Sequence, residues 1–374
     1  MPRRSVVLIV RSLGVGGAQV QLAVLARGLA ARGWTVTVMT LYADNAMAPQ
    51  LGPDVRVICV AKRGRWNMAR PAVRLFDAIR CVKPDVMIGY MPDGGLLASA
   101  CRVAAPRAAV VWSVRAAALD LSGDWLARLV RWVAAKGARL ADAIVCNSVA
   151  GAAYHALLGY PVARLSVIPN GIDVERFAPS EGRRERWRRS CGVAPNVLVI
   201  GIVGRMDPVK GYEVFLDSAA VLAREQPYVH FVCVGDGPER YREDLRVRAS
   251  LLGLGGRVTW VAAPADMADV YNGIDVLTSA STSEGFPNVV GEAMATTLPC
   301  VVTDVGDSAA IVGDTGVVVR SNSAEAVVEG WRRLIANGAQ RSAAARARVV
   351  ARFGLPRMVD ATEAVLDRAI AGRS

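Results

Sequence analysis

The chain has 374 residues, of which 53% are hydrophobic, and its formal net charge is +12. This length suits two domains better than one, and the composition excludes a disordered or low-complexity protein. No apolar run approaches the roughly 18 residues of a membrane-spanning helix, and the run that starts at Val6 ends at Arg11, too early for a secretion signal. We therefore expect a cytoplasmic protein, or one held at the inner face of the cell membrane.

The positive charge is concentrated in the first half of the chain. Residues 1–172 contain 21 Lys and Arg against 8 Asp and Glu, whereas residues 173–374 contain 24 against 25. This asymmetry indicates that the first half faces something anionic. The seven cysteines are scattered and never spaced as C-x-x-C, which favours buried, reduced thiols over disulfides or a zinc site.

The first half has the alternating strand and helix pattern of a doubly wound α/β domain. A helix is predicted at residues 19–31, with apolar residues recurring at helical spacing. Strands are predicted at residues 6–10, 34–41, 55–60, 85–90, 108–114, 143–147 and 165–168.

A glycine-rich turn joins the first strand to the first helix. Gly14, Gly16 and Gly17 let backbone amides approach a phosphate or a sugar closely at the start of that helix. The dinucleotide fingerprint G-x-G-x-x-G fails, because Gln19 stands in place of its last glycine. The acidic residue expected near the end of the second strand is also missing, which disfavours a nicotinamide-dependent dehydrogenase.

Two clusters in the first half combine basic and aromatic residues. One contains Lys62, Arg63, Arg65 and Trp66, and the other, on a predicted helix, contains Trp125, Arg128, Arg131 and Trp132. Such surfaces favour anionic headgroups or a lipid-linked pyrophosphate, so we expect them to face a membrane or an acceptor. The alternative is that the apolar stripe of this helix packs on the sheet and the arginines are merely solvated; the stripe comprises Leu126, Leu129, Val130, Val133 and Leu140.

The pattern is interrupted near residue 172 and then restarts. Pro179, Gly182, a run of arginines and Pro195 predict a linker over residues 173–195, between an N-terminal domain at 1–172 and a C-terminal domain at 196–374. Residues 342–370 are predicted to be helical and to pack back toward the first domain. Two such domains are expected to bind a ligand at the carboxyl ends of their sheets. Strands of the second domain are predicted at 197–203, 229–234, 258–261, 276–279 and 300–303.

Residues 201–211 carry two cations between a strand and a helix. Gly204 and Arg205 follow the strand, and Lys210 precedes a helix that is predicted to begin near Gly211. An arginine fork and a lysine point charge, together with the amides of a helix N-terminus, suit a diphosphate. The chain has only four lysines against 41 arginines, so a lysine at this position is notable.

Residues 283–294 place two glutamates eight positions apart around a loop that opens a helix. Glu284 is predicted to lie on the loop and Glu292 on the helix, a little over one turn from its start. Two carboxylates at this spacing can accept hydrogen bonds from hydroxyl groups at two points of one ligand. The residues between them that begin the helix are Gly285, Phe286, Pro287 and Asn288.

In this order and spacing, these motifs resemble those of the large family 4 of retaining glycosyltransferases. The resemblance covers nearly the whole chain and includes residues 167–173 and 234–238. It implies the GT-B fold, in which two Rossmann-like domains face each other across a central cleft. It also implies that Arg205 and Lys210 hold the diphosphate of a nucleotide sugar, that Glu284 contacts the transferred sugar and that Glu292 contacts the ribose.

The resemblance extends to further donor contacts and contains one departure. The loop at Gly16 and Gly17 would close over the donor. Many members of the family carry a histidine after the strand predicted at 108–114, whereas this chain has Arg115. Arg115 either takes the place of that histidine at the sugar or phosphate, or belongs to the acceptor site.

The expected reaction is transfer of a hexose or N-acetylhexosamine with retention of anomeric configuration. Arg205 and Lys210 would stabilise the leaving diphosphate, which can accept the proton of the acceptor hydroxyl. No cofactor and no metal are expected. The resemblance favours UDP over GDP, and a lipid-linked or polysaccharide acceptor in bacterial lipopolysaccharide or exopolysaccharide biosynthesis.

Two other functions remain open at this point. One is an epimerase or hydrolase of nucleotide sugars on the same fold, which would consume donor without an acceptor. The other is a non-catalytic nucleotide-sugar-binding scaffold, in which the departure at Arg115 marks a site that binds without turnover. Nucleic-acid binding is not expected, because no known module is present and the glutamate motif would have no role.

Overall fold

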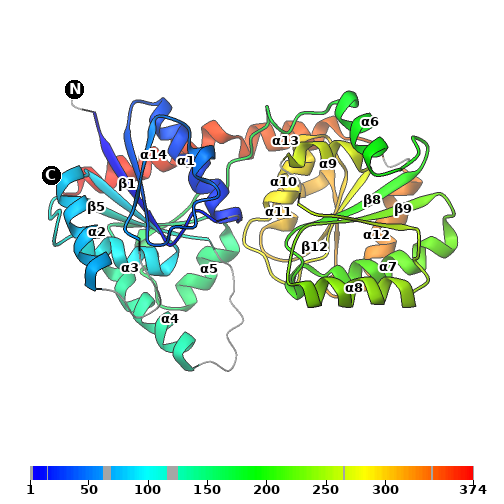
Figure 1. Ribbon diagram of the computed structural model, residues 1–374, viewed down its shortest axis with the longest axis horizontal. Helices are drawn as coiled ribbons and strands as arrows, with labels where there is room; N and C mark the ends of the chain where they lie inside the picture. The colour runs from blue at the N-terminus through cyan, green and yellow to red at the C-terminus, as the bar shows by residue number, and fades with distance from the viewer. Residues whose placement is uncertain are drawn as a thin grey trace. The chain divides into compact units, whose positions relative to one another are not determined.

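The computed structural model describes residues 3–14, 16–61, 69–115, 125–263, 266–337 and 340–373. Contacts within the chain divide it into two compact units (Figure 1). Unit 1 comprises Met1–Gly171 and Leu355–Ser374, and unit 2 comprises Ile172–Gly354. Each unit is an α/β sandwich around one parallel sheet, as the sequence predicted.

Unit 1 is built on a seven-stranded parallel sheet with the strand order β3-β2-β1-β4-β5-β6-β7. Strands buried on both faces consist largely of Val, Ile and Leu, because helices cover both sides of the sheet. The strands are β1 (Ser5–Val10), β2 (Thr35–Thr40), β3 (Val55–Cys59), β4 (Val86–Tyr90), β5 (Ala109–Val114), β6 (Ala143–Cys146) and β7 (Leu165–Val167).

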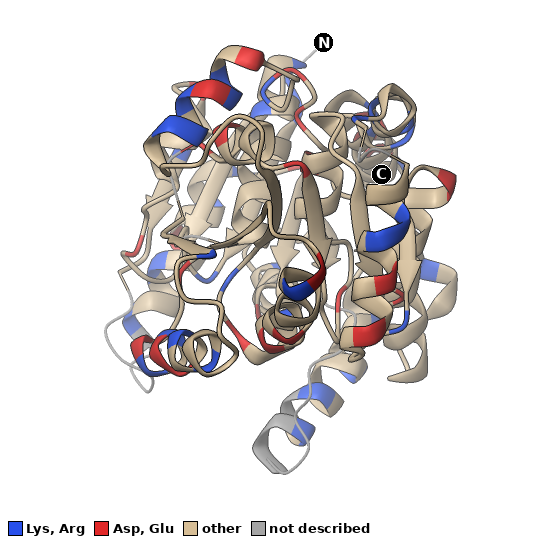
Figure 2. Ribbon diagram, turned by 90° about the vertical axis from the view of Figure 1, so that its right-hand side faces the viewer, with Lys and Arg blue, Asp and Glu red and all other residues tan. Residues whose placement is uncertain are grey.

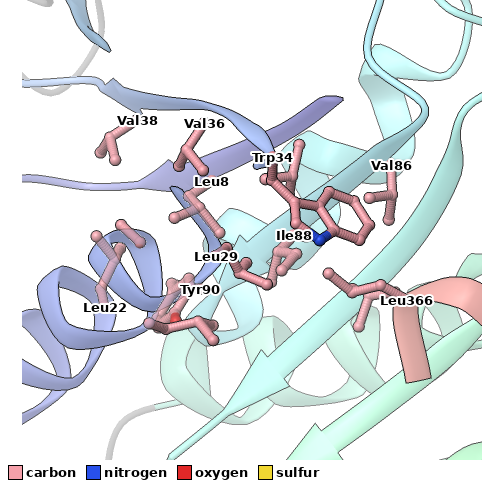
Figure 3. Close-up of a cluster of buried hydrophobic side chains, with 14 of the residues drawn as sticks. Leu8, Leu22, Leu29, Trp34, Val36, Val38, Val86, Ile88, Tyr90 and Leu366 are labelled. Carbon is pink, nitrogen blue, oxygen red and sulfur yellow. The ribbon is translucent and has the colours of Figure 1, made fainter. Parts of the chain in front are cut away.

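Helices cover both faces of this sheet. α1 (Gly17–Ala31) and α14 (Leu355–Ala371) lie on one face, above the sheet in Figure 1, and the others lie on the opposite face. Figure 3 shows the core beneath α1 and α14, where Trp34 and Leu366 pack with strand residues such as Leu8 and Ile88. The helices of the opposite face are α2 (Ala69–Val82), α3 (Met91–Cys101), α4 (Trp125–Gly137) and α5 (Val149–Leu157).

Unit 2 is built on a six-stranded parallel sheet with the strand order β10-β9-β8-β11-β12-β13. The strand β13, three residues long, was not predicted from the sequence. The strands are β8 (Leu198–Val203), β9 (Val229–Val234), β10 (Val258–Val261), β11 (Val276–Ser279), β12 (Cys300–Thr303) and β13 (Val317–Val319).

Two apolar cores flank the sheet of unit 2. The first contains Phe215, Phe231 and Trp331 beneath α7 (Tyr212–Glu225), α8 (Glu239–Leu251) and α12 (Ala324–Ala336). The second contains Trp187, Tyr271 and Phe286. The helices over the second core are α6 (Glu181–Ser190), α9 (Met267–Gly273), α10 (Asn288–Ala295), α11 (Ser308–Val312) and α13 (Ala343–Phe353).

The segment predicted as a linker, residues 173–195, is an integral part of unit 2 and contains α6. Its buried Trp187 packs into the second core, and its arginines pair with carboxylates much later in the chain. Arg183 pairs with Asp266 and Asp269, and Arg188 donates to Asp275 at 2.5 Å. The linker prediction is therefore wrong, because a run of arginines that looks solvated in the sequence forms ion pairs in the fold.

The helical stretch predicted at residues 342–370 consists of two helices in different units. α13 packs in unit 2, whereas α14 packs on α1 in unit 1. In unit 1, Glu363 of α14 accepts hydrogen bonds from Trp34 Nε1 at 2.8 Å and from Arg4 and Arg32 at 2.9 Å each. The partly buried Glu363 is therefore the polar centre of the contact between α14 and the rest of unit 1.

Neutralising Glu363 should weaken this contact. The hydrogen bond from Trp34 and the charges of Arg32 and Arg4 hold the pKa of Glu363 below its usual value of 4.5. Because the pKa is lower in the folded state, the carboxylate stabilises the fold above about pH 4.5, and this contribution is lost as the pH falls through the lowered pKa. We expect Glu363→Gln to reduce the free energy of unfolding of unit 1 by about 1 kcal/mol at pH 7.

Chemical denaturation of the natural protein and of Glu363→Gln, at pH 7 and at pH 4, tests this prediction. Asp77→Asn is the matched control. Asp77 pairs with Arg80 on the exposed face of α2, so its loss should leave stability unchanged. An equal effect of the two substitutions would refute the special role of Glu363.

Candidate functional site

Residues from two motifs meet at the carboxyl edge of the sheet in unit 2. Strands β8 and β11 are neighbours, yet the chain continues from β8 to β9 on one side and from β11 to β12 on the other. Parallel sheets commonly bind ligands at such a switch point, because the following loops diverge and leave space between them. Arg205 and Lys210 follow β8, and Glu284 follows β11.

The loop after β8 holds the two cations differently. Arg205 is largely exposed and pairs with Asp207 at 2.9 Å, while the Asp207 side chain also accepts from the backbone N–H of Val209. Lys210 ends a short 3-10 turn (Pro208–Lys210) and is only 27% exposed. Gly211 follows with a φ of 71°, and a Cβ there would clash with the backbone oxygen of Ala280, so the close approach requires glycine.

Lys210 and Glu284 form a direct ion pair. Lys210 Nζ lies 2.6 Å from Glu284 Oε1, and the Ser281 hydroxyl donates to the same oxygen at 2.7 Å. The Glu284 side chain is 10% exposed, so the pair is partly shielded from water. The structure therefore brings together Lys210 and Glu284, which are 74 positions apart in the sequence.

The loop that carries Glu284 is fixed by its neighbours. The N–H of Asp307 donates to the backbone oxygen of Gly285 at 2.9 Å, and the N–H of Thr282 donates to the oxygen of Val209 at 2.9 Å. Gly306 has a φ of 57°, and a Cβ there would clash with the backbone oxygen of Glu284. The loops after β8, β11 and β12 thus hold each other at the same edge of the sheet.

Glu292 lies on α10 and has a different environment. The hydroxyl of Tyr271, on α9, donates to Glu292 Oε2 at 2.7 Å. Burial raises the pKa of Glu292, while the Tyr271 hydrogen bond and the charge of Arg176 act in the opposite direction. The two glutamates therefore differ: Glu284 is paired with a cation, and Glu292 is held by a neutral hydroxyl.

The remaining predicted donor contacts lie around these two glutamates. Gly204 follows β8, and its backbone oxygen accepts from the Tyr212 hydroxyl at 2.7 Å. Phe286 and Pro287 are buried, and the Phe286 ring packs edge-on against Phe353 with ring centroids 5.4 Å apart. Asn288 is the first residue of α10. The side chain of Phe286 thus serves the core, so a ligand contact there would use the backbone.

In unit 1, Arg115 lies at the carboxyl end of β5. Its guanidinium donates to Asn170 Oδ1 at 2.6 Å and to Ser113 Oγ at 3.1 Å, and it lies 5.1 Å from the centroid of the Tyr90 ring. These contacts hold Arg115 at the edge of the sheet where the glycine-rich turn also lies.

The glycine-rich turn ends at the start of α1. Gly16 is the N-cap residue of α1 and Gly17 is its first, exposed residue. Because the N-cap residue is a glycine, it has no side chain that could cap the first amides of this helix.

The helix α4 exposes large apolar side chains between cations. Leu129 is 45% exposed, Trp132 60% and Val133 40%. Ala134, Ala135 and Ala138 make the buried contact instead, so the described part of the predicted apolar stripe does not pack on the sheet. We call this face the α4 surface; it comprises Arg128, Leu129, Arg131, Trp132, Val133 and Lys136, together with Leu140 of the 3-10 turn that follows (Ala138–Leu140).

The charge on α4 has a single sign. Its charged residues are Arg128, Arg131 and Lys136, and the helix at the bottom of Figure 2 correspondingly shows blue and no red. Lys136 Nζ lies 5.8 Å from the centroid of the Trp132 ring. The other predicted cluster, Lys62, Arg63, Arg65 and Trp66, and the side chain of Trp125 lie outside the described residues.

Several contacts of the site were not predicted from the sequence. Ser281, Tyr271 and Asn170 hold Glu284, Glu292 and Arg115 respectively. Ser281 could have been noticed because it lies three residues before Glu284, whereas nothing in the sequence links Tyr271 to Glu292. Within the described residues, no group of three or more His, Cys, Asp or Glu side chains could hold a metal ion, and no helix is long and apolar enough to span a membrane.

Two family models match successive parts of the chain. Residues 15–176 match the model described as Glycosyltransferase Family 4, and residues 197–337 match the model described as Glycosyl transferases group 1. The chain belongs to glycosyltransferase family 4. Its fold is GT-B, the fold of solved glycosyltransferases that align with nearly the whole chain.

This family 4 chain is similar to several characterised proteins. It is 34% identical over 194 residues to D-inositol 3-phosphate glycosyltransferase of Rhodococcus erythropolis, a match that covers 49% of the chain and 43% of that relative. It is 26% identical to the UDP-Gal:alpha-D-GlcNAc-diphosphoundecaprenol alpha-1,3-galactosyltransferase of Escherichia coli, over 70% of the chain and 69% of the relative. The match thus spans less than half the length of the Rhodococcus relative.

Among solved structures, the chain is similar to Anabaena HepE in complex with UDP-glucose. The TM-score is 0.85 at 22% identity, over 97% of this chain and 99% of HepE. This similarity supports the fold.

The buried position of Glu292 predicts a cost to stability. Burial raises the pKa of Glu292 in the folded state above 4.5, the usual glutamate value. The free energy of unfolding therefore falls as the pH rises from about 4.5 through the raised pKa. We expect Glu292→Gln to stabilise the ligand-free protein at pH 8 by about 0.5–1 kcal/mol, and much less at pH 4.5. Thermal melts at the two pH values measure the difference, and a destabilised variant at pH 8 would contradict the prediction.

Proposed function

We propose that this chain transfers a hexose or N-acetylhexosamine from a nucleotide diphosphate sugar to a lipid-linked or polysaccharide acceptor in bacterial surface polysaccharide biosynthesis. The proposal rests chiefly on the convergence of Lys210, Glu284 and Arg205 at the switch point of the sheet in unit 2. Family membership supports the reaction class. A uridine nucleotide is favoured because HepE was solved in complex with UDP and with UDP-glucose, and because the E. coli relative is named for a UDP-sugar.

In this proposal, Arg205 and Lys210 bind the diphosphate of the donor. Cleavage of the bond between the anomeric carbon and the diphosphate builds negative charge on the leaving group, and preplaced cations stabilise that charge. In the ligand-free protein, Asp207 and Glu284 compensate these cations at 2.9 and 2.6 Å. Donor binding therefore exchanges carboxylate partners for phosphate partners.

The two glutamates then have separate roles at the donor. Glu284, close to Lys210, would accept hydrogen bonds from hydroxyls of the transferred sugar. Glu292, held by Tyr271, would accept from the ribose. The backbone at Gly204, Gly285 and Asn288 would complete the contacts of the nucleotide.

We further propose that transfer retains the anomeric configuration and needs no metal. The acceptor hydroxyl would attack from the face that the leaving diphosphate vacates, and a phosphate oxygen would accept its proton. Two side-chain cations supply the charge compensation that a divalent ion supplies in other transferases. Arg115 at the carboxyl edge of unit 1 is a further candidate to contact the sugar or a phosphate.

The acceptor side is proposed to lie at an anionic membrane surface. The α4 surface combines exposed apolar side chains with Arg128, Arg131 and Lys136, the arrangement of interfacial amphipathic helices. Each cation near such a surface contributes about 1 kcal/mol of attraction. Trp132 can place its ring at the headgroup level while Lys136 contacts phosphate.

Nucleotide binding is the first test of the proposal. Thermal unfolding is recorded with UDP, GDP, ADP and dTDP, for the natural protein and for Arg205→Ala. We expect UDP to stabilise the protein, by roughly 2.7 kcal/mol at 100 times its dissociation constant, and Arg205→Ala to remove most of this effect. Arg224→Ala is the matched control, because Arg224 is exposed near the far end of α7.

The outcomes separate the possible functions. If no nucleotide stabilises the protein, the donor site is wrongly assigned. If a nucleotide binds but the corresponding sugar is neither transferred nor hydrolysed, the chain is a binding scaffold. If the sugar is consumed without an acceptor, the chain is a hydrolase or epimerase. The configuration of the product, read by NMR, tests retention.

Charge reversal on α4 tests the membrane proposal. We expect Arg128→Glu with Arg131→Glu to reduce binding to phosphatidylglycerol vesicles at least tenfold, because each substitution replaces an attraction of about 1 kcal/mol by a repulsion. Cosedimentation at physiological salt measures the effect, with Arg224→Glu and Arg240→Glu in unit 2 as the matched control. Equal binding of the α4 variant and the natural protein would rule out this surface.

A further inference from the structure

One oxygen of Glu284 has two hydrogen-bond donors. Lys210 Nζ and Ser281 Oγ lie 2.6 and 2.7 Å from Glu284 Oε1. Ser281 is buried, and the Glu284 side chain is 10% exposed. A carboxylate so shielded from water needs a donor within the protein whenever no sugar hydroxyl is there to supply one, as when a nucleoside diphosphate alone is bound.

The two donors differ in their freedom to move. Lys210 reaches Glu284 through a flexible four-carbon chain and is 27% exposed. Ser281 is anchored through its backbone: its carbonyl oxygen accepts from the hydroxyl of Thr303 at 2.6 Å and from that of Ser321 at 3.4 Å. Thr303 is the last residue of β12, and Ser321 follows β13. Neither of these hydrogen bonds involves the Lys210 side chain.

We propose that Ser281 is a positioning residue that keeps the Glu284 carboxylate hydrogen-bonded and in place when Lys210 turns to the diphosphate of the donor. This inference rests on the proposed function, since it requires that Lys210 exchanges Glu284 for a phosphate. Ser281 then allows the lysine to leave without releasing the glutamate that contacts the sugar.

The consequence is a coupling between Ser281 and nucleotide affinity. In Ser281→Ala, the departure of Lys210 would leave a largely buried carboxylate short of a donor, and this cost would oppose binding of the diphosphate. With Glu284→Gln, the side chain is neutral, so the same loss of the serine hydroxyl would cost little. A double-mutant cycle separates this coupling from a general effect of Ser281 on the loop.

Calorimetry with UDP tests the inference on the full chain. We expect Ser281→Ala to weaken UDP binding about tenfold, and Ser281→Thr, which keeps the hydroxyl, to stay within about threefold of the natural protein. In the Glu284→Gln background, Ser281→Ala should change the dissociation constant by less than about threefold. Thr282→Ala, which removes a neighbouring exposed hydroxyl, is the matched control.

The possible results distinguish this inference from the proposed function. If the natural protein binds none of UDP, GDP, ADP and dTDP, the proposed function fails, and the inference with it. If it binds UDP but Ser281→Ala binds UDP equally well, the positioning role alone is overturned. The same holds if Ser281→Ala weakens UDP binding by the same factor in the natural protein and in the Glu284→Gln background. If Ser281→Ala does not fold, Ser281→Cys replaces it, because a thiol is a weak donor, and is expected to bind more weakly than Ser281→Thr.

Discussion

The divergence of the chain after β8 and β11 is the constraint on which the site in unit 2 depends. Both strands are parallel and adjacent, so their carboxyl ends lie at the same edge of the sheet. Their loops lead to α7 and α10 on opposite faces. The loop after β8 brings Arg205 and Lys210 to the edge, and the loop after β11 brings Glu284, which pairs with Lys210. Glycines at 211 and 306 permit the close approach of the loops, so the ion pair follows from topology as much as from charge.

The strands were largely predictable because a parallel sheet covered on both faces needs continuous runs of Val and Ile. β13 (Val317–Val319) was not predicted, although β7, which is equally short, was. The segment 173–195 was misinterpreted because proline, glycine and arginine are typical of linkers. The partners of its arginines, such as Asp266 for Arg183 and Asp275 for Arg188, lie more than 80 residues away, and composition does not reveal them.

For the candidate site, the sequence predicted the charged residues but not the groups that hold them. The motifs within residues 201–211 and 283–294 predicted Arg205, Lys210 and both glutamates as site residues, and these assignments stay predictions. To predict that Lys210 and Glu284 pair with each other, one would need the order of the strands in the sheet. The hydrophobic periodicity of the sequence does not determine that order. Tyr271 reaches Glu292 from another helix, and an isolated tyrosine in an apolar stretch gives no sign of such a role.

The placement of α14 also has a consequence for the order in which the chain folds. Unit 2 is continuous from Ile172 to Gly354, whereas unit 1 needs both the first 171 residues and α14. Met358, Val359 and Leu366 fill the core above its sheet, and Glu363 compensates Arg4 and Arg32. During synthesis, unit 2 is therefore the first unit to have all its residues. Unit 1 is begun earlier, but one apolar face of it stays uncovered until α14 has been synthesised. A chaperone that acts on the nascent chain would be expected to hold that face, formed by α1 and the centre of the sheet.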